Sequence, residues 1–344
     1  MRYGDRVNLL VLGGSAFAGR AVVEDALKRG WAVTTFNRGR SPAAHRDVAR
    51  LVGDRLRQDD LRQLGKGTWD YVVDAWSGAP RAAAASAALL ADRAERCLYV
   101  SSESVYAHPA PLGADESAAT VAASPDAAEG DYPSLKRGAE LAIEAAFGDR
   151  SLLARAGAIL GPHEDVGRLP WWLLRIDRGG EVLAPGPRER PIQYVDARDL
   201  ARWLLDAAAG RLSGPFNVAS RRGHATMGSL LYACRQATGG NVELTWVSAD
   251  HIEAAKIEPW SELPIWLPPE HEYAWLHDMN VERAHAAGLR CRPLEETVQD
   301  TWQWLLSIDK RPPVKDGAPG LDPAREEAAL AAWRSPRQRV PRGR

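Results

Sequence analysis

Residues 7–19 read VNLLVLGGSAFAG, a short apolar run that leads directly into a glycine turn. Apolar residues then recur at helical spacing as far as Gly30, which predicts a strand, a tight turn and a helix in that order. A second apolar run, residues 31–36, completes a βαβ unit within the roughly thirty residues that such a unit needs. Because a glycine turn that opens a helix directs backbone N–H groups at one point, this stretch predicts a pyrophosphate site.

The alternation of strand and helix continues along the chain. Further strands are predicted at residues 49–52, 71–75, 97–101 and 151–156, and helices at residues 81–93, 134–147, 197–209, 227–238 and 323–333. This order predicts an α/β fold with a doubly wound parallel sheet. Residues 108–131 are rich in alanine, proline, serine and acidic residues, which predicts a solvated loop.

The sequence also predicts how the chain is divided. We expect a dinucleotide-binding domain over residues 1–160, to which elements near residues 190–220 return. Residues 161–308, where proline and tryptophan interrupt the periodicity, are expected to form a smaller and irregular substrate-binding region. Residues 309–344 form a Pro/Arg-rich extension whose last residues, RSPRQRVPRGR, we expect to be disordered in isolation.

Composition excludes several classes of protein. The 44 basic and 45 acidic residues leave a formal net charge of −1, so no nucleic-acid partner is expected. The start of the chain lacks a signal-peptide pattern and no run of about 18 apolar residues occurs, so we expect no membrane partner. Three cysteines without Cys-x-x-Cys spacing favour a reducing cytoplasm. The strong preference for arginine over lysine suggests a bacterial source with a GC-rich genome.

The end of the second strand bears on the choice of cofactor. A carboxylate there would bind the ribose 2′-hydroxyl of NAD, but this chain has Asn37 followed by Arg38. A guanidinium fits a 2′-phosphate, so the sequence predicts that NADP(H) is preferred, with NAD(H) as the alternative. A solvated turn arginine is the simpler interpretation of Arg38. Asp54, after the third predicted strand, is a candidate contact to adenine or an ordinary turn residue.

The most specific signal is Tyr132-Pro-Ser-Leu-Lys136, the only Tyr-x-x-x-Lys in the chain. Residues four apart share one face of a helix, so the ammonium can stabilise a phenolate and lower the pKa of the tyrosine. A surface Tyr/Lys pair is the alternative. Residues 101–104, at the end of a predicted strand, offer hydroxyl groups to a substrate oxygen.

Several motifs of this chain resemble the extended and atypical short-chain dehydrogenase/reductases, the NAD-dependent epimerase/dehydratase family. They are the glycine turn, Ser101-Ser102-x-x-Val105-Tyr106, Tyr132-x-x-x-Lys136, Arg155-x-Gly157 to Gly161-Pro162, and the run from Arg190 to Leu200. The resemblance covers about residues 7–306 and implies a Rossmann domain that binds a nicotinamide dinucleotide. It also implies that Tyr132 transfers a proton, that Lys136 lowers its pKa and holds the ribose, and that Ser102 polarises the substrate oxygen. The predicted cofactor-binding residues are Gly13, Gly14, Ser15, Phe17, Ala18, Gly19, Asn37, Arg38, Asp54, Ala75, Trp76 and Lys136.

Two positions depart from the family pattern. Ala16 replaces the middle glycine of the turn, as in atypical members that include RNA-binding proteins. Family dehydratases carry two acids after the serine or threonine, whereas here Glu103 is followed by Ser104. The predicted substrate residues are Glu103, His163, Trp171, Trp172 and Arg190. Solvation is the simpler interpretation of His163, and packing that of the two tryptophans, which would otherwise form an aromatic pocket with Trp260 and Trp266. The histidines show no metal-ligand spacing, so no metal is predicted.

These observations favour an NADP(H)-dependent oxidoreductase that transfers a hydride between nicotinamide and a carbonyl or alcohol of a small-molecule substrate. A sugar-nucleotide epimerase or dehydratase is the first alternative, in which Arg190 would bind a pyrophosphate. A non-catalytic dinucleotide- or RNA-binding protein is the second alternative. Family members often dimerise, so a homodimer is a further expectation.

Overall fold

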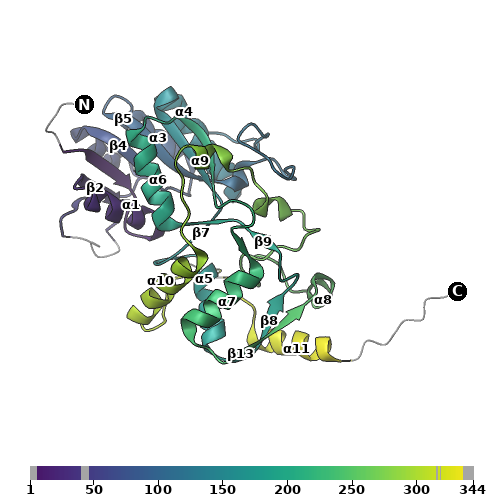
Figure 1. Cartoon of the computed structure of the whole chain (residues 1–344). Coiled ribbons are helices and arrows are strands. Elements are labelled where there is room, and N and C mark those ends of the chain that lie inside the picture. The colour runs from purple at the N-terminus through teal and green to yellow at the C-terminus, as the bar shows by residue number, and fades with distance from the viewer. Residues whose placement is uncertain (1–5, 40–45, 315–316, 318, 336–344) are drawn as a thin grey trace. The chain divides into compact units, whose positions relative to one another are not determined.

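The computed structural model describes residues 6–39, 46–314, 317 and 319–335, and the chain forms two compact units (Figure 1). Unit 1 comprises Met1–His163, Gln193–Arg222 and Trp275–Arg292. Unit 2 comprises Glu164–Ile192, Gly223–Ala274 and Pro293–Arg344. The tail predicted to be disordered comprises residues 334–344: Arg334 is the last residue of a helix in the structure, and residues 336–344 lie outside the described part of the chain.

Unit 1 is built on a seven-stranded parallel sheet. In spatial order the strands are β11 (Gly214–Val218), β6 (Ser151–Ala156), β5 (Ala94–Ser102), β4 (Trp69–Asp74), β1 (Asn8–Leu12), β2 (Ala32–Asn37) and β3 (Ala49–Val52). The chain runs outward from β1 in both directions, so the point at which the order reverses lies between β1 and β4. Sheets of this Rossmann type bind ligands beyond the carboxyl ends of the strands at that point.

Helices cover both faces of the sheet, as the alternation of strand residues requires. On β1, Leu9 and Val11 pack into one hydrophobic cluster, whereas Leu10 and Leu12 pack into another on the opposite face. The first cluster includes α1 (Phe17–Lys28), α6 (Ala197–Ala209) and α9 (Glu282–Ala286). The second includes α3 (Pro80–Leu90) and α4 (Tyr132–Phe147). The doubly wound α/β fold predicted from the sequence is therefore confirmed.

Smaller elements complete unit 1. They are α2 (Gln58–Leu61), η1 (Arg62–Lys66), η2 (Glu103–Val105), η3 (Gly148–Arg150) and the parallel pair β7 (Ala158–Leu160) and β10 (Tyr194–Asp196). The predicted loop over residues 108–131 contains neither helix nor strand, but it is not simply solvated. Glu116 accepts a hydrogen bond from the backbone N–H of Asn217 at 2.7 Å, and Ala114 is buried. Most of the loop is exposed or half-buried, as predicted, but it also packs on β11 through a polar contact that its composition does not reveal.

Unit 2 contains two short sheets and several helices. Its strands are β8 (Gly180–Pro185) paired with β13 (Val242–Val247), and β9 (Pro191–Ile192) paired with β12 (Ala225–Thr226). Its helices are α5 (Arg168–Asp177), α7 (Met227–Thr238), α8 (Ala249–Ala254), α10 (Leu294–Ser307) and α11 (Pro323–Arg334). The short helix η4 (Ala274–His277) has its first residue in this unit and its other residues in unit 1. Glu326 of α11 accepts hydrogen bonds from Arg175 of α5 and from the backbone of Leu183 of β8. The C-terminal helix is therefore an integral part of this unit.

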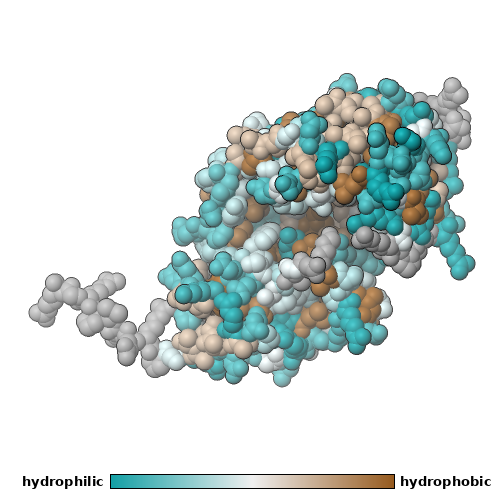
Figure 2. Space-filling view, turned by 180° about the vertical axis from the view of Figure 1, so that it is seen from behind, coloured by the Kyte–Doolittle hydropathy of each residue, from teal (hydrophilic) through white to brown (hydrophobic). Residues whose placement is uncertain are grey.

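The surface follows the pattern of a protein that keeps its apolar residues inside. Hydrophilic residues predominate on the face shown in Figure 2, with hydrophobic residues between them. Within the described ranges, no helix is both long and apolar enough to cross a membrane.

Candidate functional site

The glycine turn lies between β1 and α1 and leaves room for a ligand. Gly13 donates its backbone N–H to the carbonyl of Phe36 at 2.9 Å, which ties the turn to β2. Gly13 has φ +114°, and a Cβ built on it would meet only Ala75, at 3.9 Å. At Gly19 a Cβ would come within 2.7 Å of the backbone nitrogen of Gly14. Glycine is therefore needed at Gly19 for a close approach of helix and turn, while the side of Gly13 stays open for a pyrophosphate.

The other predicted residues of the turn occupy the start of α1. Ser15 and Ala18 are half-buried, and Phe17 is buried. Phe17 has φ +33°, which is uncommon for a residue with a large side chain. Local backbone strain of this kind often marks a ligand-binding turn. The turn thus fits a dinucleotide although Ala16 replaces the middle glycine.

The ends of β2 and β3 hold the residues predicted to meet the adenosine. Asn37 accepts a hydrogen bond from the backbone N–H of Gly39 at 2.9 Å, and its side-chain nitrogen lies 3.4 Å from the carbonyl oxygen of Gly13. Arg38 is exposed beside it. Asp54 accepts from the backbone N–H of Leu56 at 3.0 Å, so part of its carboxylate closes its own turn. Among the described residues, the end of β2 carries Asn37 and Arg38 and no acidic side chain.

The Ala75–Trp76 segment follows β4 and is held in place by a buried ion pair between Arg55 and Asp74. Arg55 binds both carboxylate oxygens of Asp74 at 2.8 Å, and the guanidinium stacks on the ring of Trp76 at 4.7 Å. Asp74 also accepts from the backbone N–H of Trp76 at 2.9 Å. The carbonyl of Trp76 is thereby fixed in position. The sequence pattern did not identify Arg55 or Asp74, because their role depends on a pairing between segments that follow different strands.

Lys136 lies at the centre of the site. Its Nζ donates to the carbonyls of Trp76 at 2.8 Å and Val100 at 2.5 Å, and it lies 4.2 Å from the centre of the Tyr99 ring. These carbonyls belong to segments at the carboxyl ends of β4 and β5. An ammonium has three donors, so one remains for a ribose or a phenol. Burial lowers the pKa of Lys136 to about 7, although the carboxylates of Asp74 and Glu140 favour its charged form.

Tyr132 is the first residue of α4, one turn before Lys136. Asp131 caps the helix by accepting from the backbone N–H of Ser134 at 2.9 Å, and Pro133 suits the first turn. The side chain of Tyr132 is 50% exposed. The phenol is therefore accessible, and the pairing of Tyr132 with Lys136 stays a prediction from the four-residue spacing.

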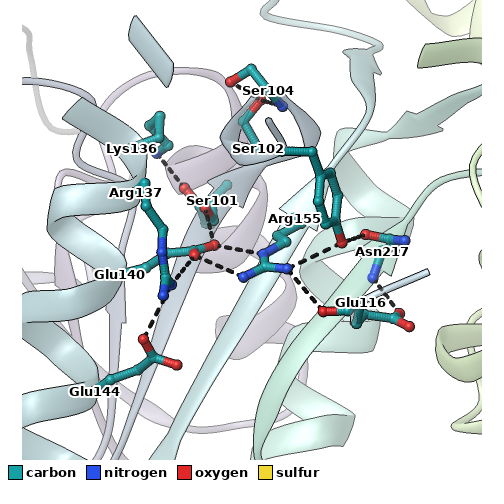
Figure 3. Close-up of polar contacts among 12 residues, drawn as sticks. Ser101, Ser102, Ser104, Glu116, Lys136, Arg137, Glu140, Glu144, Arg155 and Asn217 are labelled. Atoms are coloured by element: carbon teal, nitrogen blue, oxygen red, sulfur yellow. Dashed lines mark hydrogen bonds and ion pairs between the residues drawn. The ribbon is translucent and has the colours of Figure 1, made fainter. Parts of the chain in front are cut away.

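Ser102 ends β5 and begins η2. Its Oγ accepts hydrogen bonds from the backbone N–H of Ser104 at 3.2 Å and from the Ser104 hydroxyl at 3.0 Å (Figure 3). Two acceptor sites of the oxygen are thus used, which leaves the Ser102 proton for an external oxygen. Ser104 stands where family dehydratases carry the second acid, and here it orients Ser102. Its position two residues before Tyr106 gave no signal for this role.

The glycine turn, the Ser102 strand end and the Tyr132/Lys136 helix belong to one sheet edge, which agrees with the comparison to sequence families. The profile of the NAD dependent epimerase/dehydratase family matches residues 9–219. The chain belongs to this family. The resemblance seen in the motifs is therefore confirmed, and the protein is an enzyme of the epimerase/dehydratase group.

Solved structures support the same fold. UDP-glucose 4-epimerase from Thermotoga maritima with UDP-glucose is 18% identical, with a TM-score of 0.64 over 88% of this chain and 99% of that chain. UDP-glucose 4-epimerase from Thermus thermophilus in complex with NAD is 18% identical, with a TM-score of 0.63 over 87% and 99%. UDP-N-acetylglucosamine 4-epimerase from Methanobrevibacter ruminantium is 17% identical, with a TM-score of 0.66 over 88% and 99%. A search of curated proteins found no match.

Glu103, predicted to contact substrate, points into the protein. It is 1% exposed, and neither carboxylate oxygen has a hydrogen-bond partner among the described residues. A Cβ built on Gly157 would lie 3.1 Å from its Oε2, so the carboxyl group packs against that backbone. Burial raises the pKa of Glu103 well above its usual value. The structure therefore favours a neutral, enclosed carboxyl group over the predicted substrate contact in this enzyme of the family.

The remaining predicted substrate residues belong to different units of the chain. His163 is half-buried with φ +68° at the end of unit 1, and burial lowers its pKa, with a further contribution from Arg20. In unit 2, Trp172 is fully buried and donates to the carbonyl of Pro264 at 2.8 Å, and half-buried Trp171 packs edge-on against it. Arg190 donates to the carbonyl of Leu267 at 2.9 Å. Because Trp172 and also Trp266 have no exposed surface, the structure favours packing over the predicted aromatic pocket.

In the part of the chain that the structure describes, no group of three or more His, Cys, Asp or Glu side chains is placed to hold a metal ion. The three cysteines Cys97, Cys234 and Cys291 are free thiols, and burial raises the pKa of each.

Proposed function

We propose that this protein is a nicotinamide-dependent epimerase that acts on a sugar nucleotide through Ser102, Tyr132 and Lys136. The observation that carries the proposal is the placement of Lys136, whose buried ammonium is held by the carbonyls of Trp76 and Val100 one helical turn from Tyr132. A buried lysine at this point of the sheet has a chemical role because its burial costs free energy that packing alone would not require.

The residues of the cradle suit a dinucleotide. Gly13, Gly14 and the start of α1 would hold the pyrophosphate, and Lys136 would hold the ribose next to the nicotinamide. When bound, the nicotinamide takes up a hydride from the substrate carbon and can return it. The relatives described above were solved with NAD or with UDP-sugars, which supports both the cofactor class and the substrate class.

The side chains divide the proton chemistry. The Tyr132 phenolate accepts the proton of the substrate hydroxyl while the carbon is oxidised, and returns it when the carbonyl is reduced. The Lys136 ammonium stabilises that phenolate, and Ser102 donates a hydrogen bond to the substrate oxygen. This chemistry is reversible and needs no further acid or base.

Epimerisation is favoured over dehydration by the state of Glu103. Elimination of water needs an acid and a base in addition to the tyrosine. In this chain Ser104 replaces the second acid of the dehydratase pattern. Since Glu103 is enclosed and its charged form is disfavoured by burial, it is a poor base for abstracting a proton from substrate. We therefore place dehydration behind epimerisation.

Net reduction with NADP(H) is a second candidate, supported by one observation. The end of β2 carries Asn37 and exposed Arg38 where an NAD-selective site would carry an acid. Arg38 is free to meet a 2′-phosphate that approaches the end of β2. For both candidate functions we propose that the enzyme acts on a small-molecule substrate, that it works in the cytoplasm and that it forms a homodimer.

Cofactor titration and product analysis test the proposal. The purified full chain is titrated separately with NAD⁺, NADH, NADP⁺ and NADPH, and then incubated with UDP-glucose or UDP-N-acetylglucosamine while the product is followed by NMR. Appearance of the 4-epimer, absent in Tyr132→Phe, would support the proposal. NADP(H) preference that disappears in Arg38→Ala, with turnover of a carbonyl substrate but no epimer, would move the assignment to net reduction. Binding of none of the four dinucleotides would refute both and favour a non-catalytic role.

A further inference from the structure

A buried carboxylate, that of Glu140, is hydrogen-bonded to the end of β5 that carries Ser102. Glu140 has no exposed surface and stands four residues after Lys136 on α4. Its Oε1 accepts from the Ser101 hydroxyl at 2.7 Å and from Arg155 Nε at 3.0 Å (Figure 3). Its Oε2 accepts from Arg155 Nη2 at 3.0 Å and from Arg137 Nη1 at 2.7 Å. One side chain of α4 is thereby bonded to both β5 and β6.

We propose that Glu140 is a positioning residue that locks the end of β5, with Ser102, to the face of α4 that carries Tyr132 and Lys136. The inference deepens the proposed function and rests on it, because it assigns a further residue to the same site. Tyr132, Lys136 and Glu140 are spaced four residues apart, so all three lie along one side of the helix. Ser101 immediately precedes Ser102, so the hydrogen bond to Glu140 acts one residue away from the catalytic hydroxyl.

Arg155 of β6, which binds Glu140, is itself anchored to the neighbouring strands. Arg155 donates from Nη1 to the Tyr106 hydroxyl at 3.1 Å, and that hydroxyl donates to Asn217 Oδ1 at 2.6 Å. Asn217 belongs to β11 and Tyr106 follows η2. Glu140 is therefore held by a network that spans three adjacent strands, and networks of this kind restrict side chains to one arrangement. A fixed anchor is what a positioning role requires.

Glu140 also contributes a charge that reaches Lys136. The groups that face the ammonium are Asp74 at the end of β4, Arg55 after β3, the Tyr99 ring of β5 and Glu140 of its own helix. Asp74 and Glu140 favour the ammonium, whereas burial and Arg55 disfavour it. Removal of the Glu140 charge would therefore lower the pKa of Lys136 from its value of about 7. A residue that only filled space would have no such effect.

The experiment measures the titration of Lys136 in the full chain. The protein contains few lysines, so labelling lysine with ¹³C at Cε gives resolvable NMR signals, and Lys136→Met identifies the signal of Lys136. In Glu140→Gln, the titration midpoint of Lys136 should fall by about one pH unit, the size of effect expected from a nearby charge. The matched control is Glu144→Gln: Glu144 also binds Arg137, at 3.2 Å, but its side chain is 38% exposed and lies one turn further from Lys136. In Glu144→Gln, the titration midpoint of Lys136 should equal that of the wild type.

A second variant guards against misfolding, because Glu140→Gln leaves Arg155 buried without its partner. Glu140→Gln combined with Arg155→Met removes both charges and keeps similar volumes. Arg155 is not among the groups that set the pKa of Lys136, so the double variant should show the same lowered midpoint. Wild-type titration in both variants would overturn the proposal.

Kinetics separate this inference from the proposed function. Ser101→Ala removes only the hydrogen bond to Glu140, and kcat for UDP-glucose should fall about tenfold with little change in KM, the effect of a lost contact that aligns Ser102. An unchanged kcat in Ser101→Ala would overturn the positioning role. Failure of the wild type to bind NAD⁺ or convert UDP-glucose would refute the proposed function, while the Lys136 titration would still decide whether Glu140 acts on the lysine.

Discussion

Glu103→Met is expected to stabilise the protein. The Glu103 carboxyl group is buried against Gly157, and neither of its oxygens has a hydrogen-bond partner within the described residues. Leaving a buried polar group unsatisfied costs about 1–3 kcal/mol, and more when the group is charged. Methionine has a similar length and no polar oxygen, so it should raise the free energy of unfolding by about 1–3 kcal/mol at neutral pH.

The pH dependence gives the prediction its specificity. Burial raises the pKa of Glu103 above its unfolded value of 4.5, so the folded state binds the proton more tightly than the unfolded state. Stability of the wild type is then fully present below that unfolded value and falls as pH rises, by at most about 1.4 kcal/mol per pH unit. Methionine does not titrate, so the advantage of Glu103→Met should be larger at about pH 8 than at about pH 5.

Urea denaturation followed by tryptophan fluorescence measures the effect at both pH values. Glu103→Gln is the control, since it keeps a polar group but cannot ionise, and it should remove the pH dependence with a smaller gain in stability. A Glu103→Met protein that is less stable than the wild type, or equally changed at both pH values, would refute the reasoning that this carboxyl group is enclosed without partners. Retained turnover in the stabilised variant would show in addition that the acid has no role in catalysis.

Three further outcomes are expected. Tyr132→Phe should lower kcat by at least about 100-fold with an unchanged melting temperature, because the exposed phenol contributes little packing; steady-state kinetics and thermal unfolding check this, and near-normal turnover would contradict the role of the phenol. Ser104→Ala should lower kcat about tenfold by releasing the Ser102 hydroxyl, and an unchanged kcat would show that the backbone N–H of Ser104 suffices to orient it. Glu326→Ala should destabilise unit 2 by about 3–5 kcal/mol in urea denaturation, because Arg175 stays buried without its ion pair, while exposed Glu327→Ala should have little effect.

Local sequence was sufficient for most of unit 1. The strands Ala49–Val52 and Ser151–Ala156 and the helix Ala197–Ala209 have the bounds that the apolar pattern predicts, and so does the helix Met227–Thr238 of unit 2. Parallel strands are apolar on both faces, so they stand out from the helices between them. In unit 2, β8 and β13 pair across about sixty residues of chain and carry few consecutive apolar residues, so their pairing is visible only in the structure.

The candidate site was predictable where its chemistry follows from spacing. The glycine turn and the Tyr132/Lys136 pair are contiguous motifs whose geometry the helix and the βα turn dictate. Arg55 and Asp74, in contrast, lie nineteen residues apart and meet because β3 and β4 end at the same edge of the sheet. The two carbonyls that hold Lys136 have no side-chain signature at all. Backbone acceptors and long-range ion pairs are therefore what the sequence could not supply.

Glu103 and Glu140 show why a residue's neighbours in sequence are a poor guide to its role. Glu103 follows Ser102, the serine proposed to bind the substrate oxygen, yet it is enclosed without donors among the described residues and its neutral form is favoured. Glu140 lies far from that serine in sequence, yet two arginines and Ser101 donate to its carboxylate. A carboxylate with such donors is a fixed negative charge that can favour the Lys136 ammonium, whereas a neutral carboxyl group cannot. Glu140 in α4 and Asp74 at the end of β4 are then the fixed carboxylates that favour the Lys136 ammonium. Because the neutral form of the enclosed Glu103 is favoured, the proposed site suits reversible oxidation at one carbon better than elimination of water.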